Sequence, residues 1–227
     1  MKSEELKTIL NRGNTEEKYD AFKDLDSKFI TIEIFSILCG LLKDEDSEVR
    51  FFALYHIIDK FESFLSKIEG NLVNDFYNLL FDESALVLDR SIWALSIIGD
   101  NAIDKLYQEY QAGSLYVKKQ ISYAVGRGNF SERSQERIEI LLSGINSSDN
   151  DLSYISMCEL MYNTPLVATQ SNPWDSIYNS KTTINEIYTN VLQIARKLSK
   201  TSNIKYHESS NYYIKLIENY IKDSDLT

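Results

Sequence analysis

Apolar residues recur at intervals of three and four along almost the whole chain, which is the spacing of helices that bury one face. Alternation of apolar and polar residues over the length of a strand is missing. The pattern therefore predicts an all-α protein. We expect helices over residues 3–11, 15–27, 31–43, 47–65, 71–81, 85–99, 101–111, 115–127, 132–144, 150–163, 181–200 and 206–222.

Short polar turns separate most of these stretches, as at residues 44–47 and 147–150. Their Ser, Asp and Asn side chains are suited to accept hydrogen bonds from the free N–H groups of the helix that follows. Helices joined by such short turns pack as antiparallel neighbours. The chain is therefore predicted to be a series of helical hairpins.

A pair formed by a large residue and a small residue recurs in the second helix of successive hairpins. The small residue allows helices to approach closely, and the large residue before it is predicted to pack between repeats. The copies are Phe52-Ala53, Trp93-Ala94, Tyr123-Ala124 and Met157-Cys158.

One of these hairpins carries a motif that can be compared with a known family. Asp44 in the turn, Val49-Arg50 and then Ala53 resemble the turn and second helix of a HEAT repeat, in the HEAT/armadillo-like class. The resemblance implies a right-handed α-α superhelix, a HEAT-like solenoid of about 4–5 antiparallel helix pairs with a C-terminal capping pair. Tetratricopeptide repeats are the alternative, but their regular period and paired Gly–Tyr signature are absent.

The prolines divide the chain into three predicted parts of one continuous domain. We expect HEAT-like repeats over residues 1–163, an irregular loop over 164–180 and a capping helical hairpin over 181–227. The loop holds both prolines and shows no helical period. Its Trp174 is either an anchor for the loop or a contact residue for a partner.

The formal net charge of −10 is unevenly distributed. Residues 1–110 contain 12 Lys and Arg but 22 Asp and Glu, whereas the remainder is balanced. This field repels nucleic acid and anionic membranes and attracts a basic protein. The apolar runs are too short for a signal peptide or a membrane span, so we expect a cytoplasmic protein with reduced Cys39 and Cys158.

The sequence offers no pattern typical of an active site. His56 and His207 have no Cys or second His at metal-ligand spacing, and no phosphate-binding or nucleophile motif occurs. We therefore predict a protein that is not an enzyme and that needs no cofactor or metal.

A binding surface follows from helix geometry. If the small residue of each second helix faces the core, the positions five before, two after and six after it point away, at 100° per residue. Adding Trp174 gives the predicted partner-binding residues Glu48, Tyr55, Asp59, Asp89, Ser96, Asp100, Lys119 and Trp174.

Three functions remain open at this point. A small acidic helical-repeat chain resembles a bacterial immunity protein that neutralises a basic, nuclease-type toxin and is a monomer outside the complex. A scaffold or adaptor that binds a peptide or helix is the alternative. A HEAT-like DNA glycosylase is disfavoured, because a nucleic-acid groove needs continuous positive charge.

Overall fold

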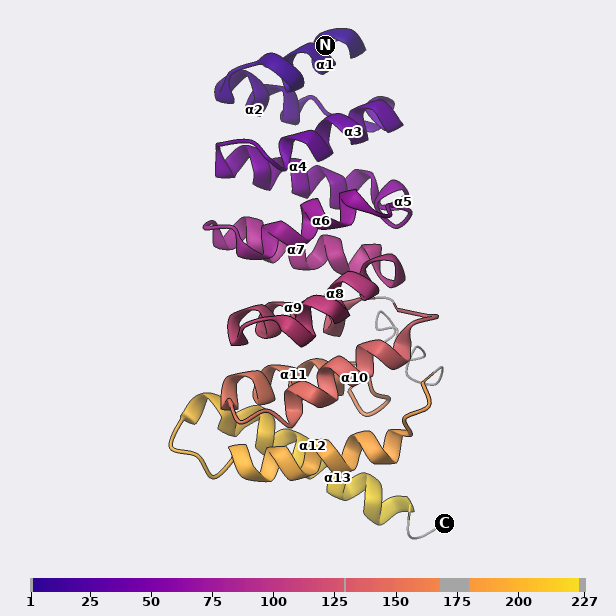
Figure 1. The fold of residues 1–227 in the computed structure, drawn as a ribbon, viewed down its shortest axis with the longest axis vertical. Coiled ribbons are helices and arrows are strands. Elements are labelled where there is room, and N and C mark those ends of the chain that lie inside the picture. The colour runs from indigo at the N-terminus through magenta and orange to yellow at the C-terminus, as the bar shows by residue number, and fades with distance from the viewer. Residues whose placement is uncertain (1, 129, 168–179, 225–227) are drawn as a thin grey trace. The chain divides into compact units, whose positions relative to one another are not determined.

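The computed structural model describes residues 2–128, 130–167 and 180–224, and within them it contains helices and no strand (Figure 1). The predicted all-α class, a stack of helix pairs, is confirmed. The helices are α1 (Ser3–Arg12), α2 (Thr15–Lys23), α3 (Ile32–Leu41), α4 (Ser47–Lys60), α5 (Glu62–Leu65), α6 (Asn71–Asn78), α7 (Ala85–Ile98), α8 (Asp100–Ala112), α9 (Leu115–Arg127), α10 (Ser134–Ile145), α11 (Asn150–Tyr162), α12 (Ile184–Leu198) and α13 (His207–Ser224).

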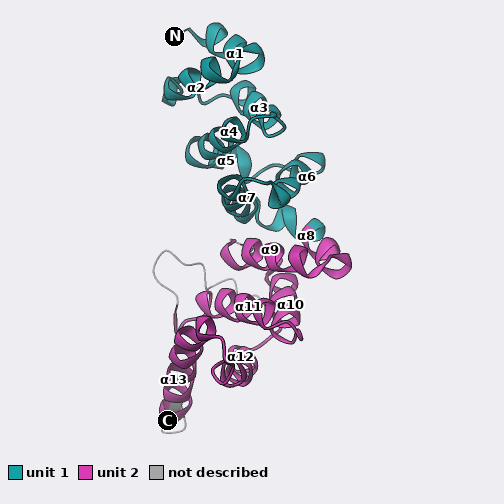
Figure 2. Ribbon diagram, turned by 90° about the vertical axis from the view of Figure 1, so that its left-hand side faces the viewer, with its two compact units in different colours: residues 1–105 teal, residues 106–227 magenta. Residues whose placement is uncertain are grey.

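The chain divides into two compact units, residues 1–105 and residues 106–227, called unit 1 and unit 2 below (Figure 2). The three-part division expected from the sequence stays a prediction. Most of the expected loop at 164–180, including Trp174, lies outside the described residues.

Unit 1 is built from helix pairs whose second helices form one layer. Helix α1 packs on α2, α3 on α4, and α6 on α7, while α2, α4 and α7 also pack on one another in that order (Figure 1). Ala53 and Ala94 are fully buried, as expected for small residues that allow close helix approach. The layer formed by α2, α4 and α7 is the surface on which the candidate site lies.

The turns carry the predicted capping chemistry. Asn14 caps α2 by accepting a hydrogen bond from the Glu17 N–H. Asp46 caps α4, because its carboxylate accepts from the N–H groups of Glu48 and Val49. These caps satisfy N–H groups that have no partner within their own helix, so they define where each second helix begins.

A series of ion pairs joins successive helix pairs inside each unit. In each, a basic residue on a second helix reaches an Asp in the turn before the next second helix. The pairs are Lys18–Asp44 at 2.6 Å and Arg50–Asp82 at 2.7 Å in unit 1, and Lys119–Asp149 at 3.0 Å in unit 2. The Arg of the HEAT-like motif therefore pairs with an acid 32 residues away, while its own turn supplies only backbone carbonyls.

Unit 2 contains a buried ionic group between α9, α10 and α11. Arg137 is 1% exposed, and its guanidinium donates to the carbonyl oxygens of Val125 and Gly126 at 2.6 and 3.1 Å, near the end of α9. Burial raises the pKa of Glu159 to about 7, although Arg127 and Arg137 act to lower it. A Cβ atom on Gly126 would lie 2.3 Å from Glu159 Cβ, so glycine is needed for this close approach.

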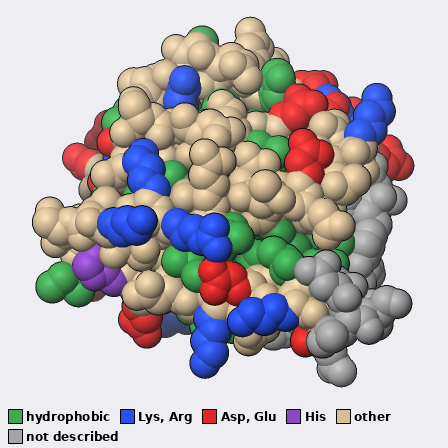
Figure 3. All heavy atoms as spheres, turned by 90° about the horizontal axis from the view of Figure 1, so that it is seen from below, with side chains coloured by type: hydrophobic (Ala, Val, Ile, Leu, Met, Phe, Trp, Pro, Cys, Tyr) green, Lys and Arg blue, Asp and Glu red, His purple; other side chains and the backbone are tan. Residues whose placement is uncertain are grey.

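The end of unit 2 formed by α12 and α13 differs from unit 1 in charge. Helix α12 packs on α13 and against α10 and α11. Lys and Arg side chains are spread over the face seen in Figure 3, with hydrophobic side chains between them. Arg196 and Lys197 of α12, together with Lys200 just after it, line a shallow hollow in this unit. No helix in the described part of the chain combines the length and the apolar character needed to cross a membrane.

Candidate acidic and aromatic binding face

Helix α4 exposes two aromatic rings between two carboxylates. Glu48, Phe52, Tyr55 and Asp59 follow one another at intervals of four, three and four residues, which places them on one helix face. Phe52 is 36% exposed and Tyr55 is 41% exposed, and both carboxylates are exposed. This stripe contains three of the residues predicted from the sequence, and it adds Phe52.

Helix α7 places a smaller set of exposed residues beside it, with one aromatic ring and one carboxylate. Its exposed residues Leu86, Asp89 and Trp93 also share one face, and Trp93 is 46% exposed. Because α4 packs directly on α7, the two stripes belong to neighbouring helices of one layer. The Arg90 guanidinium of α7 lies 6.0 Å from the ring centroid of Tyr55, so the two helices also meet through a cation–π contact. We call Glu48, Phe52, Tyr55, Asp59, Asp89 and Trp93 the acidic–aromatic face.

A groove of about 540 Å³ lies between α2 and α4 at the edge of this face. Its apolar base is formed by Phe22 and Leu25, which are 3% and 2% exposed, together with His56 at 8%. The Phe22 and His56 rings stack with centroids 5.5 Å apart. The remaining lining residues are Tyr19, Lys23, Glu48, Phe52, Tyr55, Asp59 and Lys60.

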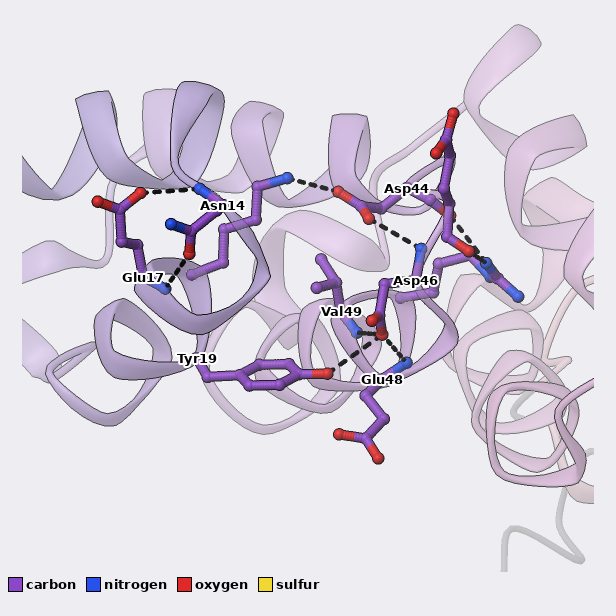
Figure 4. A network of polar contacts seen from close by, with 10 residues as sticks. Asn14, Glu17, Tyr19, Asp44, Asp46, Glu48 and Val49 are labelled. Carbon is purple, nitrogen blue, oxygen red and sulfur yellow. Dashed lines mark hydrogen bonds and ion pairs between the residues drawn. The ribbon is translucent and has the colours of Figure 1, made fainter.

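The Tyr19 ring is a wall of the groove that is held in place by the cap of α4 (Figure 4). Its hydroxyl donates to the Asp46 carboxylate at 3.1 Å, and its ring meets Phe52 edge-on at 5.7 Å. Burial, with the nearby Glu48 and Asp46 carboxylates, raises the pKa of Tyr19 well above its ordinary value of 10.0. The wall is therefore neutral and oriented before any partner arrives.

The imidazole of His56 is neutral at pH 7. Burial lowers its pKa to about 4, and Lys60 acts in the same direction while Asp59 opposes both. Its Nδ1 atom is buried and has no hydrogen-bond partner among the described residues. The base of the groove is therefore uncharged. The charged residues of its lining are Glu48 at one end, and Asp59, Lys23 and Lys60. Lys23 pairs with Asp20 at 2.8 Å.

Not every predicted residue belongs to this face. Asp100 is half-buried at the start of α8. Lys119 lies in unit 2, where its ammonium pairs with Asp149 and Asp151. Trp174 lies outside the described residues, and the partner-binding role of all three stays a prediction.

The prediction that Ser96 points to solvent is wrong. Ser96 is 4% exposed, and its hydroxyl donates to the Trp93 carbonyl oxygen at 2.7 Å. Helix α7 packs against α4, α5 and α6 and is therefore buried on more than one side. A helix wheel that assumes a single buried face fails for such a helix.

The predicted packing of the large aromatic residues between repeats is confirmed for Phe52 and needs correction for Trp93. The Phe52 ring lies 5.7 Å from Tyr19 and 5.8 Å from Phe22 of α2, measured between ring centroids, although 36% of Phe52 remains exposed. Trp93 is 46% exposed. Tyr123 is half-buried beneath Arg127, whose guanidinium lies 5.5 Å from the ring centroid. Sequence reasoning also missed Tyr19, because its partner Asp46 is 27 residues away and no local spacing reveals the pair.

No protein-family model matches the chain, and no curated protein matches it. Among solved structures, computationally designed armadillo repeat proteins for modular peptide recognition are similar at 16% identity, covering 95% of this chain and 99% of theirs, with a TM-score of 0.49. A designed armadillo repeat protein in complex with the peptide (KR)4 is 17% identical, and the match covers 96% of this chain and 100% of that protein with a TM-score of 0.47. An archaeal HEAT-like repeats protein from Thermococcus onnurineus NA1 is 12% identical, and the match covers 96% of this chain and 98% of that protein with a TM-score of 0.38.

No arrangement typical of a metal site occurs in the described residues, where no group of three or more His, Cys, Asp or Glu is placed to hold an ion. The chemistry that the acidic–aromatic face offers is ring surface and negative charge.

Proposed function

We propose that this protein is a non-catalytic binding protein whose acidic–aromatic face holds a basic segment of a protein partner. The observation that carries the proposal is the pair of exposed stripes on α4 and α7: the first holds Phe52 and Tyr55 between two carboxylates, and the second holds Trp93 with the single carboxylate of Asp89. Exposed aromatic rings supply large contact areas with few rotatable bonds. Carboxylates around them attract cationic side chains and exclude acidic partners.

The charge of unit 1 supports a basic partner. Its 105 residues contain 12 basic and 21 acidic side chains. An excess of this size raises the association rate of a positively charged partner at low ionic strength. Several acids of the unit are already paired within the chain, such as Asp44 and Asp82, so the attraction comes from those that remain exposed, such as Glu48 and Asp59.

Two kinds of partner fit this proposal. A nuclease-type toxin domain would present the basic surface with which it holds its own substrate, which is the immunity function inferred from the sequence. An extended basic segment of another protein would make the chain a scaffold. The groove of about 540 Å³ has room for individual side chains, which an extended segment can present in succession.

Replacing Tyr55 by alanine is expected to weaken binding of a basic peptide about tenfold, because the variant loses a central exposed ring. The measurement is isothermal titration of the full chain with an octapeptide of alternating lysine and arginine at low salt. The matched control is Tyr212→Ala, which removes a ring that is 52% exposed on α13 of unit 2.

A second pair of variants tests whether binding depends on the acidic–aromatic face or only on the overall negative charge of unit 1. Asp59→Asn on the face and Glu69→Gln in the turn before α6 each remove one exposed negative charge. We expect the first to weaken binding several-fold more than the second. Equal losses in both pairs of variants, or no binding by the unaltered chain, would contradict the proposed function.

A further inference from the structure

The two ends of the groove between α2 and α4 differ in their charge. Glu48 and Asp59 are eleven positions apart in α4, which corresponds to about 16 Å along the helix, so one side chain cannot reach both carboxylates. The side chain next to Asp59 in the sequence is Lys60, and Lys23 is also in the lining. The Glu48 end is therefore the more attractive place for a cation.

Glu48 is available to a partner, unlike the acids of the neighbouring turn. Asp44 pairs with Lys18, and Asp46 accepts hydrogen bonds from two N–H groups and from the Tyr19 hydroxyl. Within the described residues, Glu48 makes no ion pair with a basic side chain, and its interaction with the Tyr19 hydroxyl, which helps to raise the Tyr19 pKa, leaves its negative charge without a cation. In Figure 4 its carboxylate points away from the Asp44–Asp46 turn.

The rings beside Glu48 form a surface on which a flat cation can stack. Phe52 lies one helical turn after Glu48 and contacts Tyr19 at 5.7 Å and Phe22 at 5.8 Å between ring centroids. Tyr19 is held by Asp46, so the arrangement of the rings does not depend on the partner. The neutral His56 at the base adds no repulsion toward a cation.

The same helix already receives a guanidinium group from its own chain. Arg90 lies 6.0 Å from the ring centroids of both Phe51 and Tyr55. A guanidinium is planar and weakly hydrated, stacks on aromatic rings, and forms two parallel hydrogen bonds with one carboxylate. A lysine ammonium is a strongly hydrated point charge that gains less from such a surface.

We propose that the Glu48 end of this groove is a subsite for one arginine side chain of the partner segment, stacked on Phe52 and Tyr19 and paired with Glu48. The inference rests on the proposed function and makes it more specific. It states which side chain enters the groove and which residues select it over lysine.

The test compares octaarginine with octalysine, which carry the same charge, as ligands of the full chain. The unaltered protein is expected to bind octaarginine about fivefold more tightly, since stacking on exposed rings contributes modestly. Glu48→Gln is expected to bring the ratio of the two dissociation constants close to one. The control Asp59→Asn removes a charge at the other end, so it weakens both peptides and leaves the ratio unchanged.

The outcomes separate this inference from the function on which it rests. A ratio in Glu48→Gln equal to that of the unaltered chain would overturn the arginine subsite, while peptide binding itself would still support the proposed function. Absence of binding for both peptides would overturn both. Phe52→Leu provides a second variant, which keeps Glu48 but removes the ring on which the guanidinium stacks. We expect it to lower the ratio of the two dissociation constants. Circular dichroism verifies that each variant is folded.

Discussion

Replacing Arg50 by methionine is expected to lower the free energy of unfolding by about 3 kcal/mol, because it breaks a buried ion pair from one side. The Arg50 guanidinium binds both carboxylate oxygens of Asp82, at 2.7 and 2.9 Å. Only 6% of the Asp82 side chain is exposed, so the variant leaves an uncompensated buried charge. Arg50 also donates to the carbonyl oxygens of Asp44 and Glu45, which lose a donor.

Urea denaturation followed by circular dichroism measures this loss. The control is Lys43→Met, which removes a pair with Asp75 in which 68% of the lysine side chain is exposed. A pair in that environment contributes less than about 1 kcal/mol. The double variant Arg50→Met, Asp82→Leu is expected to recover part of the loss, since no charge is left buried. Equal effects of Arg50→Met and Lys43→Met would contradict the proposed role of Arg50.

The second large effect is expected in the pH dependence of stability and comes from Glu159 in unit 2. Its pKa is about 7 in the folded chain and 4.5 as an ordinary carboxyl, so the folded state binds the proton more tightly than the unfolded state. Stability therefore falls as pH rises from 4.5 to 7 and levels off above that range. The expected loss is about 3 kcal/mol, at 1.36 kcal/mol for each pKa unit.

The difference in unfolding free energy between the natural chain and Glu159→Gln isolates this contribution, because glutamine does not titrate. The difference is expected to shift in favour of the glutamine variant as pH rises from 4.5 to 7 and to stay constant above that range. Glu208→Gln in α13 serves as the control, since its carboxyl is exposed. A difference that stays constant with pH would contradict the raised pKa and show that Arg127 and Arg137 fully offset the effect of burial on Glu159.

The positions of the helices were predictable because periodicity and capping act over a few residues. Asp46 caps α4 and Asp149 caps α11 at the turns where polar clusters had indicated a break. The predicted helix over residues 47–65 is divided in the structure at Phe61, which ends α4 and precedes the short α5. Phe61 is fully buried, so tertiary packing accounts for a break that local propensity does not show.

The candidate site was predictable only in part, because a helix wheel gives direction but not neighbours. It placed Glu48, Tyr55 and Asp59 on one exposed face of α4. It could not show that neighbouring helices bury α7 on several sides, so that Ser96 is buried while Trp93 is exposed. Pairs such as Tyr19 with Asp46 join residues from different hairpins, and a single sequence carries no local trace of them.

The ion pairs between successive helix pairs determine which piece of unit 1 can be exchanged as a module. A hairpin made of α3 and α4 contains Arg50 but not its partner Asp82. Residues 47–84 instead begin with α4, end at the turn before α7, and hold both members of the pair. A chain lengthened by duplicating residues 47–84 would give every copy of Arg50 its own Asp82, whereas duplicating the α3–α4 hairpin would pair one copy of Arg50 with the repeated Asp44, which occupies the equivalent turn. The segment that carries its own native ion pair is therefore displaced by one helix from the structural hairpin.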